Sequence, residues 1–108
     1  MQIDITGQQL EVTEPIKDYI ETKFDRIKRH SDQVLSVHVV LNVEKIRHKS
    51  EATVHIGGKD FFAESTEDHL YKSIDSMVDK LDKQIRRHKS KLNNHNNKEA
   101  LAINRSQY

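Results

Sequence analysis

The sequence predicts an α+β fold of order β-α-β-β-β-α, in which two helices cover one face of a four-stranded sheet. Short stretches in which apolar and polar residues alternate are typical of half-buried strands. Two longer stretches repeat apolar residues every three or four positions, as amphipathic helices do. With 108 residues and no internal repeat, the chain has room for one domain.

The first strand and first helix are predicted near the N-terminus. Residues 2–6 alternate, with Ile3 and Ile5 on one face, and Gly7 ends this strand. A helix start is predicted at 13–15, because Thr13 can cap the helix and Pro15 tolerates the first turn. The apolar stripe that follows ends before residues 30–32 and consists of Ile16, Tyr19, Ile20, Phe24 and Ile27.

Three further strands are predicted to form a meander. The first alternates through residues 37–43, and a charged connection at 44–49 leads to a second alternation at 52–56. Gly57-Gly58 predicts a hairpin turn, because glycine adopts positive φ at both central positions. The returning strand contains Phe61, Ala63 and Ser65, and either Phe61 or its neighbour Phe62 can face inward.

The last element is predicted to be a long amphipathic helix capped by Ser65 or Thr66. Its apolar stripe consists of Leu70, Ile74, Met77, Val78, Leu81, Ile85 and His88. Ending at about Leu92, it has a length of about 40 Å, so its last turns extend beyond the small core. We assign 1–92 to one domain and 93–108 to a disordered polar tail. Both helices are expected to point their C-termini toward the Gly57-Gly58 turn.

Composition argues against several functional classes. The absence of cysteine excludes disulfides and thiolate chemistry, and three glycines are too few for nucleotide-binding loops. The seven histidines are scattered, although His38 and His55 could meet across strands, so we expect no metal, no cofactor and no enzyme activity. No apolar run reaches membrane-spanning length and the start resembles no leader, which predicts a cytoplasmic protein.

Positive charge is concentrated in the C-terminal halves of both predicted helices, although the net charge is only +1. The dipoles of the helices and ion pairs within each helix explain part of this pattern. The pairs expected at i,i+4 are Asp79 with Lys83, Asp82 with Arg86 and Asp25 with Arg29. On the last helix, Asp75, Asp79 and Asp82 share one flank, whereas Lys83, Arg87 and Lys91 form a self-repelling ladder at i, i+4, i+8. On the first helix, the flank of Lys23, Arg26 and His30 has no carboxylate of its own. Such surfaces favour a polyanionic partner.

If the polyanionic partner is a nucleic acid, the motifs that the sequence lacks indicate how the protein would contact it. It has neither the Gly-x-x-Gly of a KH domain nor the strand aromatics of an RRM. We therefore expect contacts with phosphate and sugar rather than base stacking.

Several stretches together resemble a known family. They are MQIDITGQQLEVTEPIKDYIETKF, VVLNVEK (39–45), Gly57-Gly58 and LYKSIDSMVDKLDKQIRRHKSKL (70–92). This order of residues is similar to that of the short-form ribosome hibernation-promoting factors of proteobacteria, within the ribosome-associated translation inhibitor and sigma-54 modulation protein family. The resemblance implies a fold like that of double-stranded RNA-binding domains, and inhibition of translation under stress and in stationary phase.

The resemblance also implies partners and contact residues. The partners are the small ribosomal subunit with its 16S rRNA at the tRNA and mRNA channel, 70S ribosomes and inactive 100S dimers, and ribosome modulation factor as a cooperating protein. Off the ribosome the chain is expected to be a monomer. The expected RNA-binding residues are Lys23, Arg26, Lys28, Arg29, Lys80, Lys83, Arg86, Arg87, Lys89 and Lys91.

Three alternatives stay open from the sequence. One is the single-domain translation inhibitor subtype, which opposes ribosome pairing and has an extended C-terminal tail; the tail of this chain is intermediate, whereas its VEK stretch favours the hibernation-promoting form. The second is a free-standing binder of duplex RNA, which the lack of a Lys-Lys-x-Ala-Lys run disfavours. The third is a regulator that docks on a protein.

Overall fold

The computed structural model describes residues 2–30 and 34–96, and it describes residues 30, 34, 35 and 89–96 by their backbone alone. The elements follow one another as β1 (Gln2–Gln8), α1 (Glu14–His30), β2 (Val34–Glu44), β3 (Arg47–Ile56), β4 (Lys59–Glu67) and α2 (Leu70–Asn96). The predicted order of strands and helices is therefore confirmed. Within the described residues, neither helix is long and apolar enough to cross a membrane.

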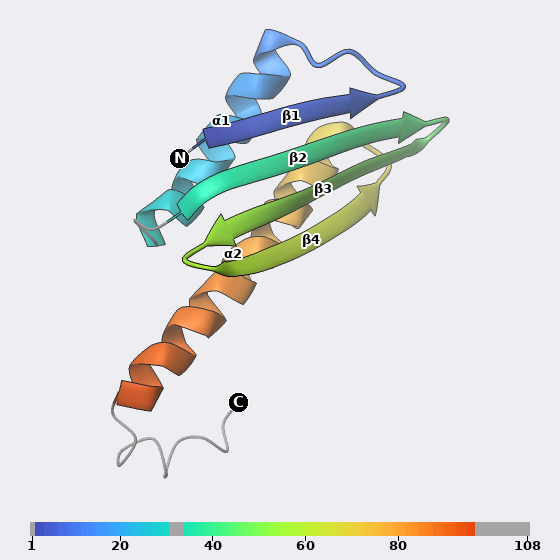
Figure 1. Ribbon diagram of the computed structural model, residues 1–108. Coiled ribbons are helices and arrows are strands. Elements are labelled where there is room, and N and C mark those ends of the chain that lie inside the picture. Colours follow the sequence, from blue (N-terminus) through green and yellow to red (C-terminus); the bar gives the residue numbers. More distant parts are fainter. Residues whose placement is uncertain (1, 31–33, 97–108) are drawn as a thin grey trace.

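The four strands form one sheet in the order β1-β2-β3-β4 (Figure 1). β1 runs parallel to β2, with Ile3 opposite Val37, and α1 provides the crossover between them. β2, β3 and β4 pair antiparallel, with Val37 opposite Val54 and Val54 opposite Phe61. The predicted crossover and meander are both present.

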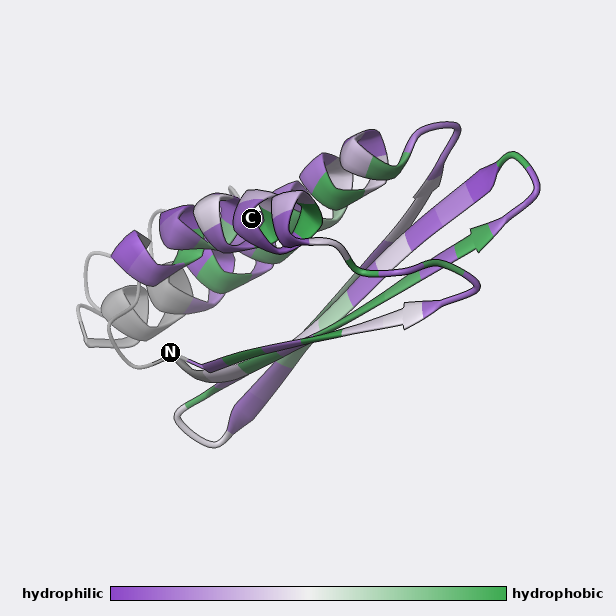
Figure 2. Ribbon diagram, turned by 90° about the horizontal axis from the view of Figure 1, so that it is seen from above, coloured by the Kyte–Doolittle hydropathy of each residue, from purple (hydrophilic) through white to green (hydrophobic). Residues whose placement is uncertain are grey.

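Both helices pack on the same face of the twisted sheet, which makes a molecule of two layers (Figure 2). The apolar stripes of the two helices supply Ile20, Phe24, Ile27, Ile74, Met77, Val78, Leu81 and Ile85 to the core. Alternate residues of the inner strands, such as Val39 and Val54, fill the other side. Each large apolar side chain buried in this way contributes about 1.5–3 kcal/mol.

Of the two hairpin turns, the sequence predicted the one between β3 and β4 correctly and the one between β2 and β3 wrongly. Gly57 and Gly58 adopt φ of 49° and 82°, as predicted for their turn. The predicted charged connection at 44–49 is wrong, because β2 and β3 continue through it and pair Glu44 with Arg47. Only Lys45 and Ile46 remain outside the strands, and Lys45 permits the tight turn by adopting φ of 56°. The inward phenylalanine of β4 is Phe61, while Phe62 is exposed on the opposite face.

The predicted cap of α2 is wrong. β4 runs on to Glu67, so Ser65 and Thr66 are paired in the sheet and cannot begin a helix. His69 caps α2 instead: its carbonyl accepts the N–H of Ser73 at 3.1 Å, and its Nδ1 accepts the N–H of Tyr71 at 3.3 Å. The start of α1 follows the prediction, because the carbonyl of Thr13 accepts the N–H of Lys17 at 3.0 Å.

The ends of two other elements differ from the prediction. β1 continues through Gly7 to Gln8, and glycine is needed there because a Cβ would approach the carbonyl oxygen of Leu10 within 2.6 Å. α2 passes the Gly57-Gly58 turn, where the His88 ring contacts Phe61, and continues beyond the sheet to Asn96 (Figure 1). Residues 93–96 of the predicted tail are thus helical, and residues 97–108 lie outside the described part of the chain.

Candidate nucleic-acid interface

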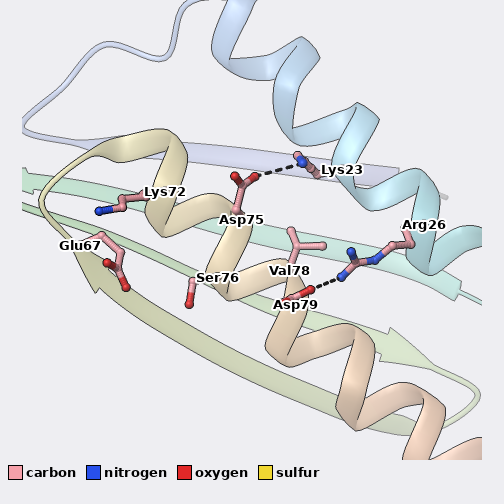
Figure 3. A pocket seen from close by; sticks show the side chains of 8 residues that line it. All are labelled: Lys23, Arg26, Glu67, Lys72, Asp75, Ser76, Val78 and Asp79. Atoms are coloured by element: carbon pink, nitrogen blue, oxygen red, sulfur yellow. Dashed lines mark hydrogen bonds and ion pairs between the residues drawn. The ribbon is translucent and has the colours of Figure 1, made fainter.

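The two helices lie side by side, and the acidic flank of α2 faces the basic flank of α1. The rings of Tyr19 on α1 and Tyr71 on α2 are 4.5 Å apart between centroids. One turn further along, a groove of about 440 Å³ lies between Lys23 and Arg26 of α1 and Asp75 and Asp79 of α2 (Figure 3). We call this line of contacts the α1–α2 seam.

Ion pairs between the helices close the seam. Lys23 Nζ lies 3.2 Å from Asp75 Oδ1, and Arg26 Nη2 donates to Asp79 Oδ1 at 2.6 Å (Figure 3). The hydrogen bond from Arg26 holds the pKa of Asp79 below its usual range. The flank of α1 that carries no carboxylate of its own is therefore neutralised by carboxylates from the other helix.

Asp82 is the buried acid of the seam, with a side chain only 5% exposed. Its Oδ2 lies 3.5 Å from Nε of Arg26 and 3.1 Å from Nε of Arg86. A carboxylate out of contact with water needs such cationic partners, since an unpaired buried charge is strongly destabilising. Arg26 and Arg86 thus stabilise the packing of the helices.

Tyr19 adds a neutral hydrogen-bond donor to the seam, and Asp75 accepts its hydrogen bond. The Tyr19 hydroxyl donates to Asp75 Oδ1 at 2.6 Å, and Lys23 Nζ lies 5.3 Å from the centre of the Tyr19 ring. Partial burial of the ring and then the hydrogen bond to Asp75 raise the pKa of Tyr19 to about 12, because both disfavour a phenolate.

The opposite flank of α2 faces β4. Lys80 Nζ donates to the carbonyl oxygen of Glu64 at 2.8 Å, and Gln84 Nε2 donates to that of Phe62 at 2.8 Å. β4 is an edge strand, and alternate carbonyls of an edge strand face away from the sheet and lack a backbone partner. One cation predicted for RNA binding, Lys80, therefore also protects the sheet edge.

The remaining predicted contact residues are exposed cations on the C-terminal halves of the helices. They are Lys28 and Arg29 on α1, and Lys83 and Arg87 on α2. Within the described side chains none of these four forms an ion pair, although Arg29 Nε donates to the carbonyl of Asp25 at 3.4 Å. Lys89 and Lys91 continue α2, and their side chains are outside the described set. The cations nearest the seam are thus engaged, while these four are available to a partner.

The acids of the seam have a role that the sequence did not reveal. Spacing along one helix correctly placed Asp75, Asp79 and Asp82 on a common flank, and the predicted pair of Asp82 with Arg86 is present. The other two predicted pairs are wrong: Asp79 pairs with Arg26, and Arg29 donates to the backbone carbonyl of Asp25. It could not show that this flank faces Arg26, 53 residues away from Asp79 in the sequence. The possible signal was the complementarity itself: a basic flank and an acidic flank on two helices that cover one sheet.

Comparisons with known proteins place the chain in a family. The family model described as "Sigma 54 modulation protein / S30EA ribosomal protein" matches residues 3–93. A protein of Azotobacter vinelandii named ribosome hibernation promoting factor is 44% identical over 91 residues, covering 84% of this chain and 85% of that protein. A protein of Escherichia coli K12 with the same name is 39% identical over 95 residues, covering 88% of this chain and 100% of that protein.

Solved structures share the fold. A ribosomal subunit interface protein from Coxiella burnetii matches with a TM-score of 0.78 at 27% identity, covering 83% of this chain and 99% of that one. The N-terminal domain of Thermus thermophilus Protein Y matches with a TM-score of 0.78 at 35% identity, covering 82% and 99%. The family model covers residues 3–93, which include nearly all of the sheet and of both helices, and the chain therefore belongs to the Sigma 54 modulation protein / S30EA ribosomal protein family.

Proposed function

We propose that this protein is a ribosome hibernation factor, which binds the small ribosomal subunit through 16S rRNA at the tRNA and mRNA channel and inhibits translation. The observation that carries the proposal is the group of four exposed cations, Lys28, Arg29, Lys83 and Arg87, which have no ion pair within the described part of the chain. The names of relatives up to 44% identical support a ribosome as the source of the polyanion.

The mode of binding follows from the chemistry of this surface. Guanidinium and ammonium groups bind phosphates through charge-assisted hydrogen bonds, and arginine can do so with two bonds at once. The four cations come from helices that the seam holds together, so their relative positions are set before RNA arrives. A preorganised surface of this kind recognises the spacing of phosphates, which is a property of folded RNA rather than of base sequence.

The finer part of the proposal concerns ribosome pairing. Residues 1–92 form the ribosome-binding unit, and the protein acts with ribosome modulation factor to promote inactive 100S dimers. The alternative subtype blocks ribosomes without dimerising them. The relatives named ribosome hibernation promoting factor favour the first of these two outcomes.

Sedimentation on a sucrose gradient tests the binding step. The protein is mixed with separated small and large subunits in turn, and we expect it to move with the small subunit only. Protein that stays at the top with every particle would contradict the proposal. If it then bound an isolated RNA duplex, the free-standing duplex binder would replace it; if it bound neither, the protein-docking regulator would be favoured.

A second gradient tests pairing. We expect 70S ribosomes to shift to 100S when both this protein and ribosome modulation factor are added, and not with either one alone. Retained binding without a 100S peak would assign the chain to the subtype that does not dimerise ribosomes.

A further inference from the structure

A second cationic site lies on the flank of α2 that faces away from α1. Here the C-terminal half of α2 passes the turn between β3 and β4 (Figure 1). A hollow of about 260 Å³ opens between them, lined by Lys59, Asp60, Phe61, Gln84, Arg87 and His88. We call it the hairpin hollow.

The floor and one wall of the hairpin hollow are fixed by the pleat of β4. Lys59 and Phe61 are two residues apart, so both side chains lie on the helix-covered face of the strand. Lys59 Nζ lies 6.0 Å from the centre of the Phe61 ring, and the His88 ring lies 5.3 Å from the same ring at 65°. Because Phe61 is only 6% exposed, it forms an apolar floor with polar groups around its rim.

The acid of the hairpin hollow is directed to the other face of the sheet. Asp60 alternates with Phe61 and is bonded to His55, which is opposite it on β3 and belongs to the face without helices. Gln84 is also engaged, through its bond to the carbonyl oxygen of Phe62. Lys59 and Arg87 are exposed, and neither has an ion pair among the described side chains.

This arrangement contrasts with the α1–α2 seam. In the seam, carboxylates of α2 lie within ion-pair distance of Lys23, Arg26 and Arg86. At the hairpin hollow, two cations from separate elements face a common space. Among the described residues that line it, the one carboxylate is that of Asp60, which has its partner on the opposite face. Like charges gathered in this way repel each other slightly, and a bound anion removes that cost.

We propose that the hairpin hollow is a binding site for one phosphate of the RNA backbone, held jointly by Lys59 and Arg87. The site rests on the proposed function and extends it to a residue, Lys59, that the charge pattern of the helices did not include. The anion approaches from the open side, where it contacts the guanidinium of Arg87 and the ammonium of Lys59. The ribose can then lie toward the rings of Phe61 and His88.

The test uses neutral variants of the full chain: Lys59→Gln, Arg87→Gln and the double variant. Lys17→Gln is the matched control, because Lys17 is an exposed lysine near the N-terminal end of α1. Binding to small subunits is measured at several salt concentrations, and thermal melts check that each variant is folded. We expect Lys59→Gln and Arg87→Gln each to weaken binding about tenfold or more, and Lys17→Gln to bind like the wild type.

A shared phosphate makes a specific prediction for the double variant. Its loss of affinity is expected to be clearly smaller than the product of the two single losses, because either substitution already impairs the same contact. The plot of log affinity against log salt is expected to become less steep by the equivalent of about one phosphate contact in the double variant, not two.

The outcomes separate the site from the function. If the wild type binds and Lys59→Gln binds equally well while folded, the hairpin hollow is not a phosphate site and the proposed function stands. Losses that multiply fully would mean separate phosphates, and weakened binding with an unchanged salt slope would mean a protein contact; either result overturns the shared site. If the wild type itself fails to bind, both the function and the site are overturned.

Discussion

The hydroxyl of Tyr19 on α1 donates a hydrogen bond to Oδ1 of Asp75 on α2, 2.6 Å away. The same oxygen forms an ion pair with Lys23, whose Nζ lies 3.2 Å away. A phenol, a lysine and a carboxylate are thus combined at the N-terminal end of the seam. Each lysine described near this end has an ion pair: Lys17 with Glu14, Lys23 with Asp75 and Lys72 with Asp68. This end of the seam contributes to the packing of the helices, and the available positive charge begins further along, at Lys28.

The bond between Tyr19 and Asp75 predicts a loss of stability at alkaline pH. In the folded protein the pKa of Tyr19 is raised from 10.0 to about 12, so the neutral phenol is favoured by folding. This contribution is fully present below pH 10 and is lost as the pH rises from 10 to 12. We expect the melting temperature of the wild type to fall more steeply over this range than that of Tyr19→Phe, which has no such proton to lose.

Absorbance of tyrosinate checks the assignment independently. The sequence has three tyrosines, and one of them is expected to ionise near pH 12 in the folded protein. The Tyr19→Phe variant is expected to lack this late step. Its persistence in the variant would assign the high pKa to another tyrosine and would remove the basis of the alkaline prediction.

The four exposed cations predict a steep dependence of ribosome binding on salt. Each phosphate contact releases about 0.7–0.9 of a counterion, so four contacts correspond to a loss of about 50- to 150-fold between 50 and 200 mM salt. Magnesium is kept constant in this measurement, because its removal dismantles the ribosome. An affinity that hardly changes over this range would favour protein contacts or base readout.

The sequence predicted features that depend on residues close together in the chain, and it missed contacts between residues that are far apart. Alternation, helical spacing and turn residues are local, and they correctly predicted all six elements and the Gly57-Gly58 turn. The order of these elements then predicted the shared face of the helices. The preference of helix caps for serine and threonine did not predict the cap at His69, because β4 runs on to Glu67 and includes Ser65 and Thr66. At the site, i,i+4 spacing identified the pair of Asp82 with Arg86. It could not identify Arg26 with Asp79, or Lys59 beside Arg87, since those contacts exist only once the layers have packed.

The C-terminal part of the chain is predicted to be dispensable for folding. Truncation after Leu92 removes the last four residues of α2 and residues 97–108. Among the α2 side chains that the structure describes, the last buried core residue is Ile85. We expect the free energy of unfolding to change by no more than about 0.5 kcal/mol. Binding to small subunits is also expected to survive, because the truncated chain keeps Lys83, Arg87 and Lys91.

Thermal melts and 100S gradients of the truncated chain measure the two properties separately. Marked destabilisation would mean that the removed residues pack on the domain. A folded, ribosome-bound truncation with altered pairing would show instead that these residues determine the subtype.

Two arginines on neighbouring helices are expected to affect different properties when they are replaced. Arg26 is paired with Asp79 and with buried Asp82. Arg26→Gln removes one of the two arginines that lie beside the Asp82 carboxylate, and Arg86 remains. Breaking a buried ion pair costs about 3–5 kcal/mol, and the remaining arginine lowers this to about 1–3 kcal/mol. We expect a clearly lower melting temperature for Arg26→Gln, and ribosome binding close to that of the wild type at temperatures where the variant is folded.

Arg87→Glu is expected to do the reverse. Arg87 is exposed and lies one turn from Lys83, so a glutamate there replaces like-charge repulsion by attraction, and stability is expected to be unchanged or slightly higher. On the ribosome the same change replaces a phosphate donor with a group that RNA repels. Losing one charged contact costs about 2–3 kcal/mol and reversing the charge costs more, so binding is expected to weaken by about a hundredfold or more.

Lys17→Glu makes the same change in net charge at the far end of α1 and is the control. Pelleting with small subunits and thermal melts on the same preparations decide the matter: a stable Arg87→Glu protein that pellets like the wild type would mean that this flank of α2 does not contact RNA.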